Sequence, residues 1–181
     1  NIAYRAFANA KTMTSFTMPN TVVTIEDYAF RGCNNLQSIV LSEQLKSIGG
    51  YAFHKDESLS SIVIPNNVTT IGMLAFCGCT NLKSAQLSSS LKEITMSLFQ
   101  ECTNLESVLI PNSVEVIGRS AFLSCEKLKS ITIPNSVVSI EFLDHIYDQF
   151  SNCDLLESII VEEGNPIYDS RSNANAIIET N

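Results

Sequence analysis

The side chains with the most obvious chemical potential are His54, Asp56, Cys77 and Cys79, in two pairs separated by 23 residues. Histidine, cysteine and carboxylate side chains are zinc ligands. Residues two apart on a short helical turn point in different directions, however, and known zinc-ligand spacings are wider. We therefore expect no metal site, with His54 and Cys77 at an exposed position and Cys79 inside.

Residues for catalysis are also scarce. His54 and His145 are the two histidines, so a serine or cysteine nucleophile has few bases available. No glycine-rich phosphate loop follows a strand-like segment, and acidic pairs such as Glu162 and Glu163 are typical of solvated faces. We expect no catalytic residue, no cofactor and no enzyme activity; an enzyme or metal protein resting on the four residues above is the third functional alternative.

Five of the six cysteines occupy equivalent positions, each three residues after a phenylalanine. Adjacent copies of a stacked repeat would bring their Cα atoms to about 5 Å, inside the disulfide range of about 4.4–6.8 Å. Stacked side chains point the same way, however, so their Cβ atoms approach poorly. We expect reduced thiols, buried as small hydrophobic groups. These cysteines are Cys33, Cys79, Cys102, Cys125 and Cys153.

The elements that position these residues repeat every 23 residues. A fixed period of this length is the signature of a repeat protein, in which each unit buries its apolar face against its neighbours. Other apolar columns keep the same step, such as Ile25, Ile48 and Ile71. The phenylalanines that define the period are Phe7, Phe30, Phe53, Phe76, Phe99 and Phe122.

Each repeat is expected to contain a strand, a turn, a second short extended piece and one helical turn. Between Ser61 and Pro65 the β-branched residues alternate, which predicts a strand with Ile62 and Ile64 inward and Ser61 and Val63 outward. Residues 68–71 are expected to be extended, and residues 72–78 to form a helical turn. One parallel sheet is predicted from strands near 13–18, 36–41, 59–64, 82–87, 105–110, 128–133 and 156–161.

The spacing of Leu128, Ile131 and Ile133 is similar to the strand signature of leucine-rich repeats. The longer string from Ile110 to Leu128, Ile-Pro-Asn-Ser-Val-x-x-Ile-Gly-x-x-Ala-Phe-x-x-Cys-x-x-Leu, resembles the BspA-like subfamily. The resemblance implies a right-handed β/α solenoid in a secreted or cell-surface microbial protein associated with adhesion. The departures are Ser42 and Ser88 in place of proline after the strand, and Leu98 in place of a small residue.

Residues 1–181 are thus expected to form a single leucine-rich repeat solenoid that starts and ends within a repeat, as a fragment of a longer protein. The register breaks once, because Ile117 and Phe122 are five residues apart whereas Ile140 and Phe150 are ten apart. The five extra residues are expected to extend the short turn into an amphipathic helix of two or three turns, which either packs on the convex side or acts as a lid or docking ridge. Its apolar residues are Phe142, Leu143, Ile146, Tyr147 and Phe150.

Composition narrows the class of partner. The formal charge of −8 and the pI near 4.7 oppose binding to phosphate backbones or anionic lipid. No apolar run approaches the roughly 18 residues of a membrane helix. We therefore expect a protein partner, no nucleic acid and no direct membrane insertion.

The surface left for binding is the outward face of the sheet. Small serines and exposed apolar residues there suit a broad protein contact, although strands favour β-branched residues in any case. We predict a non-catalytic, surface-exposed interaction or adhesion module; the alternative is a structural spacer that projects another domain. The predicted binding residues are Ser38, Val40, Ser61, Val63, Ser84, Gln86, Ser107, Leu109, Ser130 and Thr132.

Overall fold

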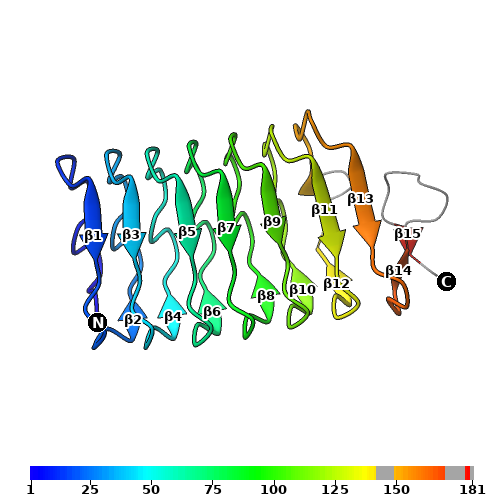
Figure 1. The fold of residues 1–181 in the computed structure, drawn as a ribbon, viewed down its shortest axis with the longest axis horizontal. Coiled ribbons are helices and arrows are strands. Elements are labelled where there is room, and N and C mark those ends of the chain that lie inside the picture. Colours follow the sequence, from blue (N-terminus) through cyan, green and yellow to red (C-terminus); the bar gives the residue numbers. More distant parts are fainter. Residues whose placement is uncertain (142–148, 170–177, 180–181) are drawn as a thin grey trace.

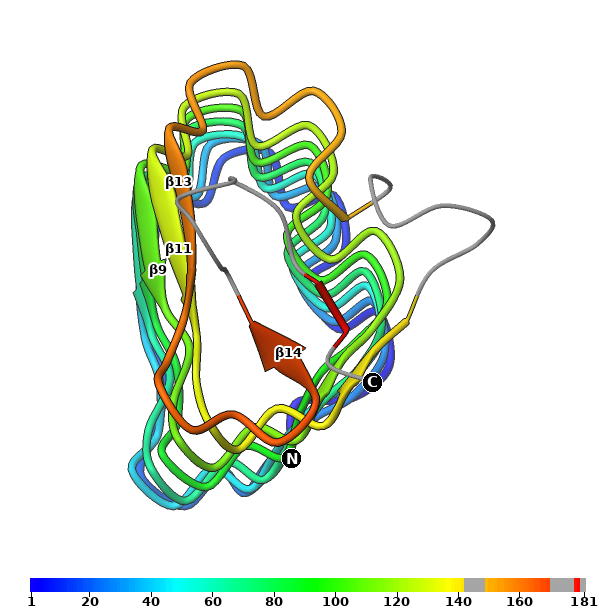
Figure 2. The same ribbon diagram turned by 90° about the vertical axis from the view of Figure 1, so that its right-hand side faces the viewer.

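The computed structural model describes residues 1–141, 149–169 and 178–179. The chain winds into a solenoid whose successive 23-residue turns, called rungs below, lie side by side along one axis (Figure 1). Viewed along that axis, the rungs superimpose on a common outline (Figure 2). The predicted repeat architecture is therefore confirmed.

One side of the solenoid is built from short parallel strands, one per rung. Their register advances by one repeat: Ser61 pairs with Ser84 and Ser84 with Ser107. They match the predicted strand positions but are shorter, and their hydrogen bonds form three groups, β1-β3, β5-β7-β9 and β11-β13. The strands are β1 (Ser15–Thr17), β3 (Ser38–Val40), β5 (Ser61–Val63), β7 (Ser84–Gln86), β9 (Ser107–Leu109), β11 (Ser130–Ile133) and β13 (Ser158–Val161).

Each longer strand is followed in the chain by a turn and then by a two-residue strand. These two-residue strands pair with one another in parallel and form a second ladder along the solenoid. Each buries an isoleucine at its second residue, and Ile48 pairs with Ile25 and Ile71. Of the second extended piece predicted at 68–71, the last two residues, Thr70 and Ile71, form a strand. These strands are β2 (Thr24–Ile25), β4 (Ser47–Ile48), β6 (Thr70–Ile71), β8 (Glu93–Ile94), β10 (Val116–Ile117) and β12 (Ser139–Ile140).

The prediction of an α/β fold with helical turns is wrong. The described residues contain no helical element, and they form a parallel β-solenoid. The third side consists of tandem tight turns, in which Ala29, Arg31 and Cys33 each donate a backbone N–H to the carbonyl three residues earlier. Two residues per rung have positive φ, such as Tyr28 at 60° and Gly32 at 75°. Positive φ at these turn positions is incompatible with a continuing helix.

On this side every second backbone N–H points to the next rung, which explains why tandem turns replace a helix. Tyr28, Phe30 and Gly32 donate to carbonyls of the next rung, at 2.9, 2.8 and 2.9 Å. In residues 28–33 the backbone donors are therefore satisfied alternately within the turns and between rungs. The Ala-Phe-x-x-Cys spacing resembled a helical face because the same three side chains point inward in both arrangements.

The core consists of columns in which equivalent side chains of successive rungs stack along the axis. Phe30, Phe53, Phe76, Phe99 and Phe122 are fully buried, and neighbouring phenylalanine rings stack with centroids 5.0–5.9 Å apart. Each ring is covered by the rings of the two adjacent rungs, so one repeat alone could not bury it. Stability therefore depends on the interfaces between rungs.

The departures from the repeat pattern are accommodated inside the core. Ser42 and Ser88, which replace proline, are fully buried. Each accepts with its Oγ the backbone N–H of the residue two positions later, at 3.1 Å. These short-range bonds close the turn that proline would otherwise favour. Leu98 is fully buried like the alanines at the equivalent position.

The predicted amphipathic helix falls mostly on residues 142–148, outside the described residues. The rung resumes at Gln149, which is fully buried and bonds Gly118 O and Ala121 N–H of the preceding rung. Phe150 then continues the ring stack against Phe122. Near the C-terminus β14 (Tyr168–Asp169) pairs antiparallel with β15 (Ile178–Glu179).

Candidate protein-binding site

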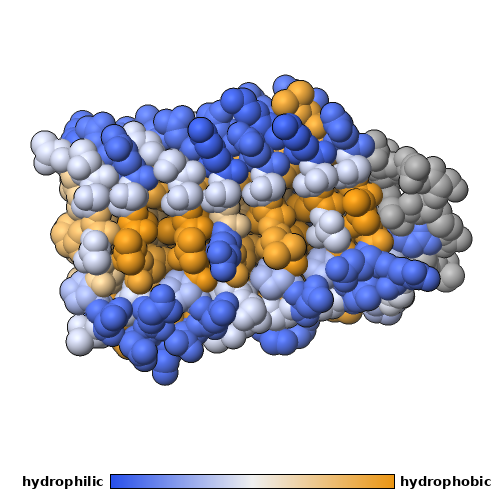
Figure 3. Space-filling model, in the orientation of Figure 1, coloured by the Kyte–Doolittle hydropathy of each residue, from blue (hydrophilic) through white to orange (hydrophobic). Residues whose placement is uncertain are grey.

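The residues predicted to bind lie together on one surface, called here the sheet face: the outward side chains of β1, β3, β5, β7, β9, β11 and β13. Alternation along each strand places a serine and, two residues later, a larger side chain on the outside. Of the ten predicted residues, nine are exposed and Thr132 is half-buried. Figure 3 shows the result as a pale row beside an apolar row, with hydrophilic residues on both flanks.

The apolar row is unusually exposed for such large side chains. The exposed fractions are 59% for Val40, 58% for Val63, 77% for Leu109 and 49% for Ile160. Gln86 and Thr132 interrupt this row. Because the intervening residues Ile39, Ile62 and Val108 point into the core, the outer side chains stand on a supported backbone. The sheet face is therefore a rigid, shallow surface with apolar contact area.

Charges of both signs border the serine row. Lys83, Glu106, Lys129 and Glu157 are exposed at the residue before each serine. Neighbours in this row are linked through the backbone: the Glu106 N–H donates to Lys83 O at 3.0 Å, and the Glu157 N–H to Lys129 O at 2.9 Å. The spacing of these charges is therefore as regular as the strands, and such charges set specificity more than affinity.

The cysteine column is internal, and all six cysteines are buried and free. In the column each thiol donates to the carbonyl of the phenylalanine 26 or more residues earlier, as Cys79 Sγ does to Phe53 O at 3.1 Å and Cys102 Sγ to Phe76 O at 3.2 Å. Burial raises the pKa of both thiols. They are protonated at neutral pH, and the thiol, unlike the thiolate, is a poor nucleophile.

Asp56 takes the place of a cysteine in this column. It lies 23 residues from both Cys33 and Cys79 in the sequence. Its side chain is fully buried; Oδ1 accepts the Cys33 N–H at 2.8 Å, whereas Oδ2 has no hydrogen-bond partner. Burial raises the pKa of Asp56 to about 8, against the opposing effect of backbone N–H groups. The carboxyl group therefore carries a proton at neutral pH.

The four residues considered for zinc occupy different environments. His54 is half-buried, and its Nδ1 accepts the Arg31 Nε–H at 3.4 Å. The expectation that Cys77 is exposed is wrong, because its side chain is only 3% exposed beneath the turns. Among the described residues no three His, Cys, Asp or Glu side chains come close enough to hold a metal ion.

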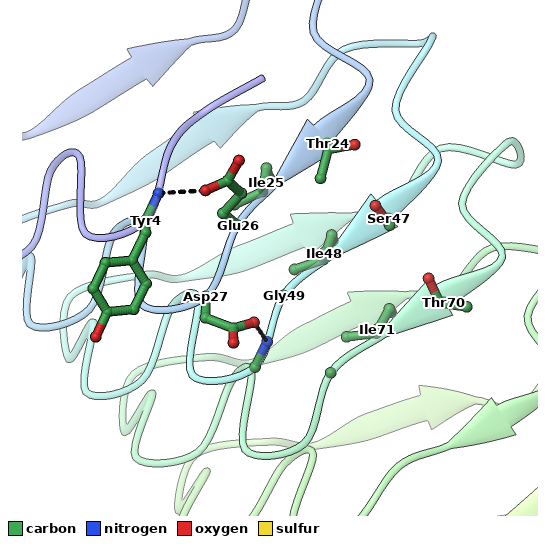
Figure 4. Close-up of a pocket in the computed structure, with 12 residues that line it drawn as sticks. Tyr4, Thr24, Ile25, Glu26, Asp27, Ser47, Ile48, Gly49, Thr70 and Ile71 are labelled. Carbon is green, nitrogen blue, oxygen red and sulfur yellow. Dashed lines mark hydrogen bonds between the residues drawn. The ribbon is translucent and has the colours of Figure 1, made fainter.

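An open hollow of about 500 Å³ lies beside β2, β4 and β6 (Figure 4). It exists because glycines let the rungs approach: a Cβ on Gly72 would lie 2.3 Å from Gly50 N. Its two carboxylates already accept backbone N–H groups, Glu26 from Tyr4 and Asp27 from Gly50, both at 2.8 Å. Neither carboxylate of the hollow is therefore left without a hydrogen-bond partner.

A second surface group was not anticipated. Tyr4, Tyr28 and Tyr51 form a ladder of rings on the tight turns of the first rungs, with centroids 5.8 and 4.8 Å apart. The guanidinium groups of Arg5 and Arg31 lie over these rings. The sequence signal was available, since Arg5, Tyr28 and Tyr51 are successive members of one repeat column.

The stacked parallel strands and the leucine, isoleucine and phenylalanine columns define the class: a leucine-rich repeat solenoid. The chain belongs to the BspA-type leucine-rich repeat family, whose model matches residues 1–102 and 46–177 with six copies. Leucine-rich repeat proteins are generally interaction scaffolds without enzymatic activity.

Solved structures of bacterial leucine-rich repeat proteins share this fold. One from Eubacterium ventriosum is 32% identical, with a TM-score of 0.77 over 88% of this chain and 42% of that chain. The leucine-rich repeat protein of T. pallidum is 28% identical, with a TM-score of 0.55 over 69% of each chain. The pneumococcal vaccine antigen PcpA is 25% identical, with a TM-score of 0.52 over 92% of this chain and 34% of that chain.

The chain thus spans less than half of the Eubacterium ventriosum protein. A comparison with curated proteins finds no match. Within the described residues, no helix has the length and apolar character needed to cross a membrane.

Proposed function

We propose that this chain is a non-catalytic protein-interaction module, used in adhesion, of a secreted or cell-surface protein, and that it binds through the sheet face. One observation carries the proposal: a supported row of exposed apolar side chains runs in register along the solenoid. Leu109 has 77% of its surface exposed and Val63 58%, so both offer apolar contact area to a partner. Apolar side chains ringed by polar groups are typical of protein contacts.

Membership of the BspA-type family supports a role in protein binding rather than catalysis. A surface location is supported by the family resemblance and by PcpA, a similar protein described as a vaccine antigen. The partner we propose is a protein of a host matrix or of a neighbouring microbial surface.

The experiment measures binding of the purified chain to immobilised host matrix and to fixed microbial cells. Val63→Asp combined with Leu109→Asp should abolish binding, because both charges would have to be desolvated in the contact. The matched control is Val138→Asp, at a valine that is 49% exposed away from the sheet face. Equal binding by both variants would contradict the sheet-face proposal and favour the role of a spacer.

A further inference from the structure

The turns on the third side of the solenoid present a surface of different chemistry from the sheet face. We call it the turn face, meaning the outward side chains of residues 4–9, 28–32, 51–55, 73–78 and 96–101, among which Tyr28, Tyr51 and His54 are half-buried. At its N-terminal end lies the tyrosine–arginine cluster, which consists of Tyr4, Arg5, Tyr28, Arg31, Tyr51 and His54.

The cluster is pre-organised by contacts between its own members. The Arg5 guanidinium lies 5.1 Å from the centroid of Tyr4 and 5.2 Å from that of Tyr28. Arg31 is held between the Tyr28 ring, at 5.9 Å, and His54 Nδ1, at 3.4 Å. Burial and the charge of Arg31 lower the pKa of His54, so its imidazole is neutral and able to accept. Little side-chain entropy would be lost when these arginines meet a ligand.

The positive charge of this region is available to a partner. Arg5, Arg31 and Lys55 are exposed, and the ion pair found among the described residues, Lys92 with Glu115, lies elsewhere. The nearby carboxylates have other contacts: Glu26 and Asp27 accept backbone N–H groups, and Glu101 accepts the Gln100 amide. A guanidinium stacked on a ring keeps its N–H groups at the edge free for a carboxylate.

The next two rungs continue the turn face with apolar groups. Met73 and Met96 are 48% and 40% exposed at equivalent positions. The Tyr51 N–H donates to Met73 O and the Leu74 N–H to Met96 O, so the two methionines directly follow the tyrosine ladder. Methionine adapts its shape to varied apolar partners, whereas tyrosine and arginine are enriched where binding energy concentrates.

We infer that the turn face is a second binding surface, which takes an extended polypeptide segment with acidic residues over the tyrosine–arginine cluster and apolar residues over Met73 and Met96. From the rung of Arg5 to that of Met96 is four rung spacings, about 19 Å at ~4.8 Å per rung. About six extended residues at ~3.3 Å each cover this length. A polypeptide supplies both the carboxylates and the apolar side chains, whereas a sulfated glycan supplies only the anions.

The test uses the whole chain and a fluorescein-labelled peptide, DEDEGLFL, in an anisotropy titration. Control peptides are KRKRGLFL, with the charges reversed, and DEDEGSGS, without apolar side chains. Arg5→Glu combined with Arg31→Glu should weaken DEDEGLFL binding at least about tenfold, and raised salt should mimic the loss. Arg5→Gln with Arg31→Gln should give a smaller loss, and Met73→Ser with Met96→Ser about threefold.

Unchanged thermal unfolding of each variant shows that the effects are local. Val63→Asp, on the sheet face, should leave DEDEGLFL binding intact, so failure of this inference is distinguishable from failure of the proposed function. Equal binding of KRKRGLFL, or full binding by the arginine variants, would overturn the inference. So would equal binding of DEDEGSGS together with displacement by heparin, because the surface would then select polyanions rather than a polypeptide.

Discussion

The sheet face and the turn face are built from the same repeats, yet they differ in how the backbone presents side chains. On the sheet face extended strands alternate in and out, so exposed positions are evenly spaced and carry serine and single apolar residues. On the turn face two positive-φ residues per rung, such as Tyr51 and Lys55, project long side chains outward beside one another. The first arrangement gives a flat, uniform surface, and the second a local cluster of particular residues.

The difference shows where specificity can arise in a repeat protein. The serine row is the same in every strand of the sheet face, so it cannot distinguish one rung from another. The turn face changes along the axis from arginine and tyrosine to methionine. A partner that binds at a defined position along the solenoid can therefore take its register from the turn face.

The largest expected effect comes from a substitution in the core, which supports both the sheet face and the turn face. Phe76 is fully buried between Phe53 and Phe99, with centroids 5.2 and 5.8 Å away. Phe76→Ala should lower the free energy of unfolding by about 3–5 kcal/mol through the cavity that it leaves. Urea denaturation followed by circular dichroism measures this. Leu109→Ala, at an exposed position, should change it by less than about 0.5 kcal/mol, and similar losses for the two variants would refute the stacked-core account.

The second effect is a pH dependence of stability that arises on the turn side alone. Asp56 lies there, and no buried acidic residue lies beneath the sheet face among the described residues. The pKa of Asp56 is about 8 when folded and about 3.9 when unfolded. Between these values the folded chain retains a proton that the unfolded chain has released. The free energy of unfolding should therefore fall as pH rises, by about 4 kcal/mol from pH 5 to pH 8.

Asp56→Cys is the matched variant, because it restores the column residue and a thiol that can donate to Phe30 O. Its pH profile should lack the decline. The lowered pKa of His54 acts with the opposite sign, since protonation of His54 at low pH favours the unfolded chain, but it affects both proteins equally. Parallel profiles for the two proteins would show that Asp56 is not a buried acid.

The third prediction separates the two faces by function. Leu109→Asp alone should weaken binding to the matrix or microbial partner about tenfold, because a charge enters the centre of the apolar row. Binding of DEDEGLFL should not change. Biolayer interferometry with both ligands on one preparation checks this, and a loss of peptide binding as well would mean that the two faces act as one site.

The smallest expected effect concerns the positioning of Arg31. His54→Phe retains a ring against Tyr51, whose centroid is 5.5 Å from that of His54, but removes the nitrogen that accepts from Arg31. Binding of DEDEGLFL should weaken about threefold, equivalent to ~0.6 kcal/mol, and matrix binding should remain. In the wild type, peptide binding should also weaken below the lowered pKa of His54, whereas the variant should show no such pH step.

Much of the architecture was predictable from the period of 23 residues. Stacking identical rungs forces the phenylalanine, leucine and isoleucine columns inward, so the core, the strand positions and the exposed row followed from the sequence. The insertion before Gln149 was also visible as a break in register. The helical turn was predicted wrongly because Ala75, Phe76 and Cys79 have the same spacing on a helix as on tandem turns, and apolar spacing alone cannot distinguish the two.

By itself, the sequence of this protein determined the family, the repeat and the residues of the sheet face. Only the tertiary structure decided the conformation of the turns, because hydrogen bonds to the next rung compete with those of a helix. It also decided that Asp56 lies in a buried column with one oxygen unpartnered, and that two arginines lie over a tyrosine ladder. Those properties arise between residues about 23 apart in sequence but on adjacent rungs, and they exist only once the rungs are stacked.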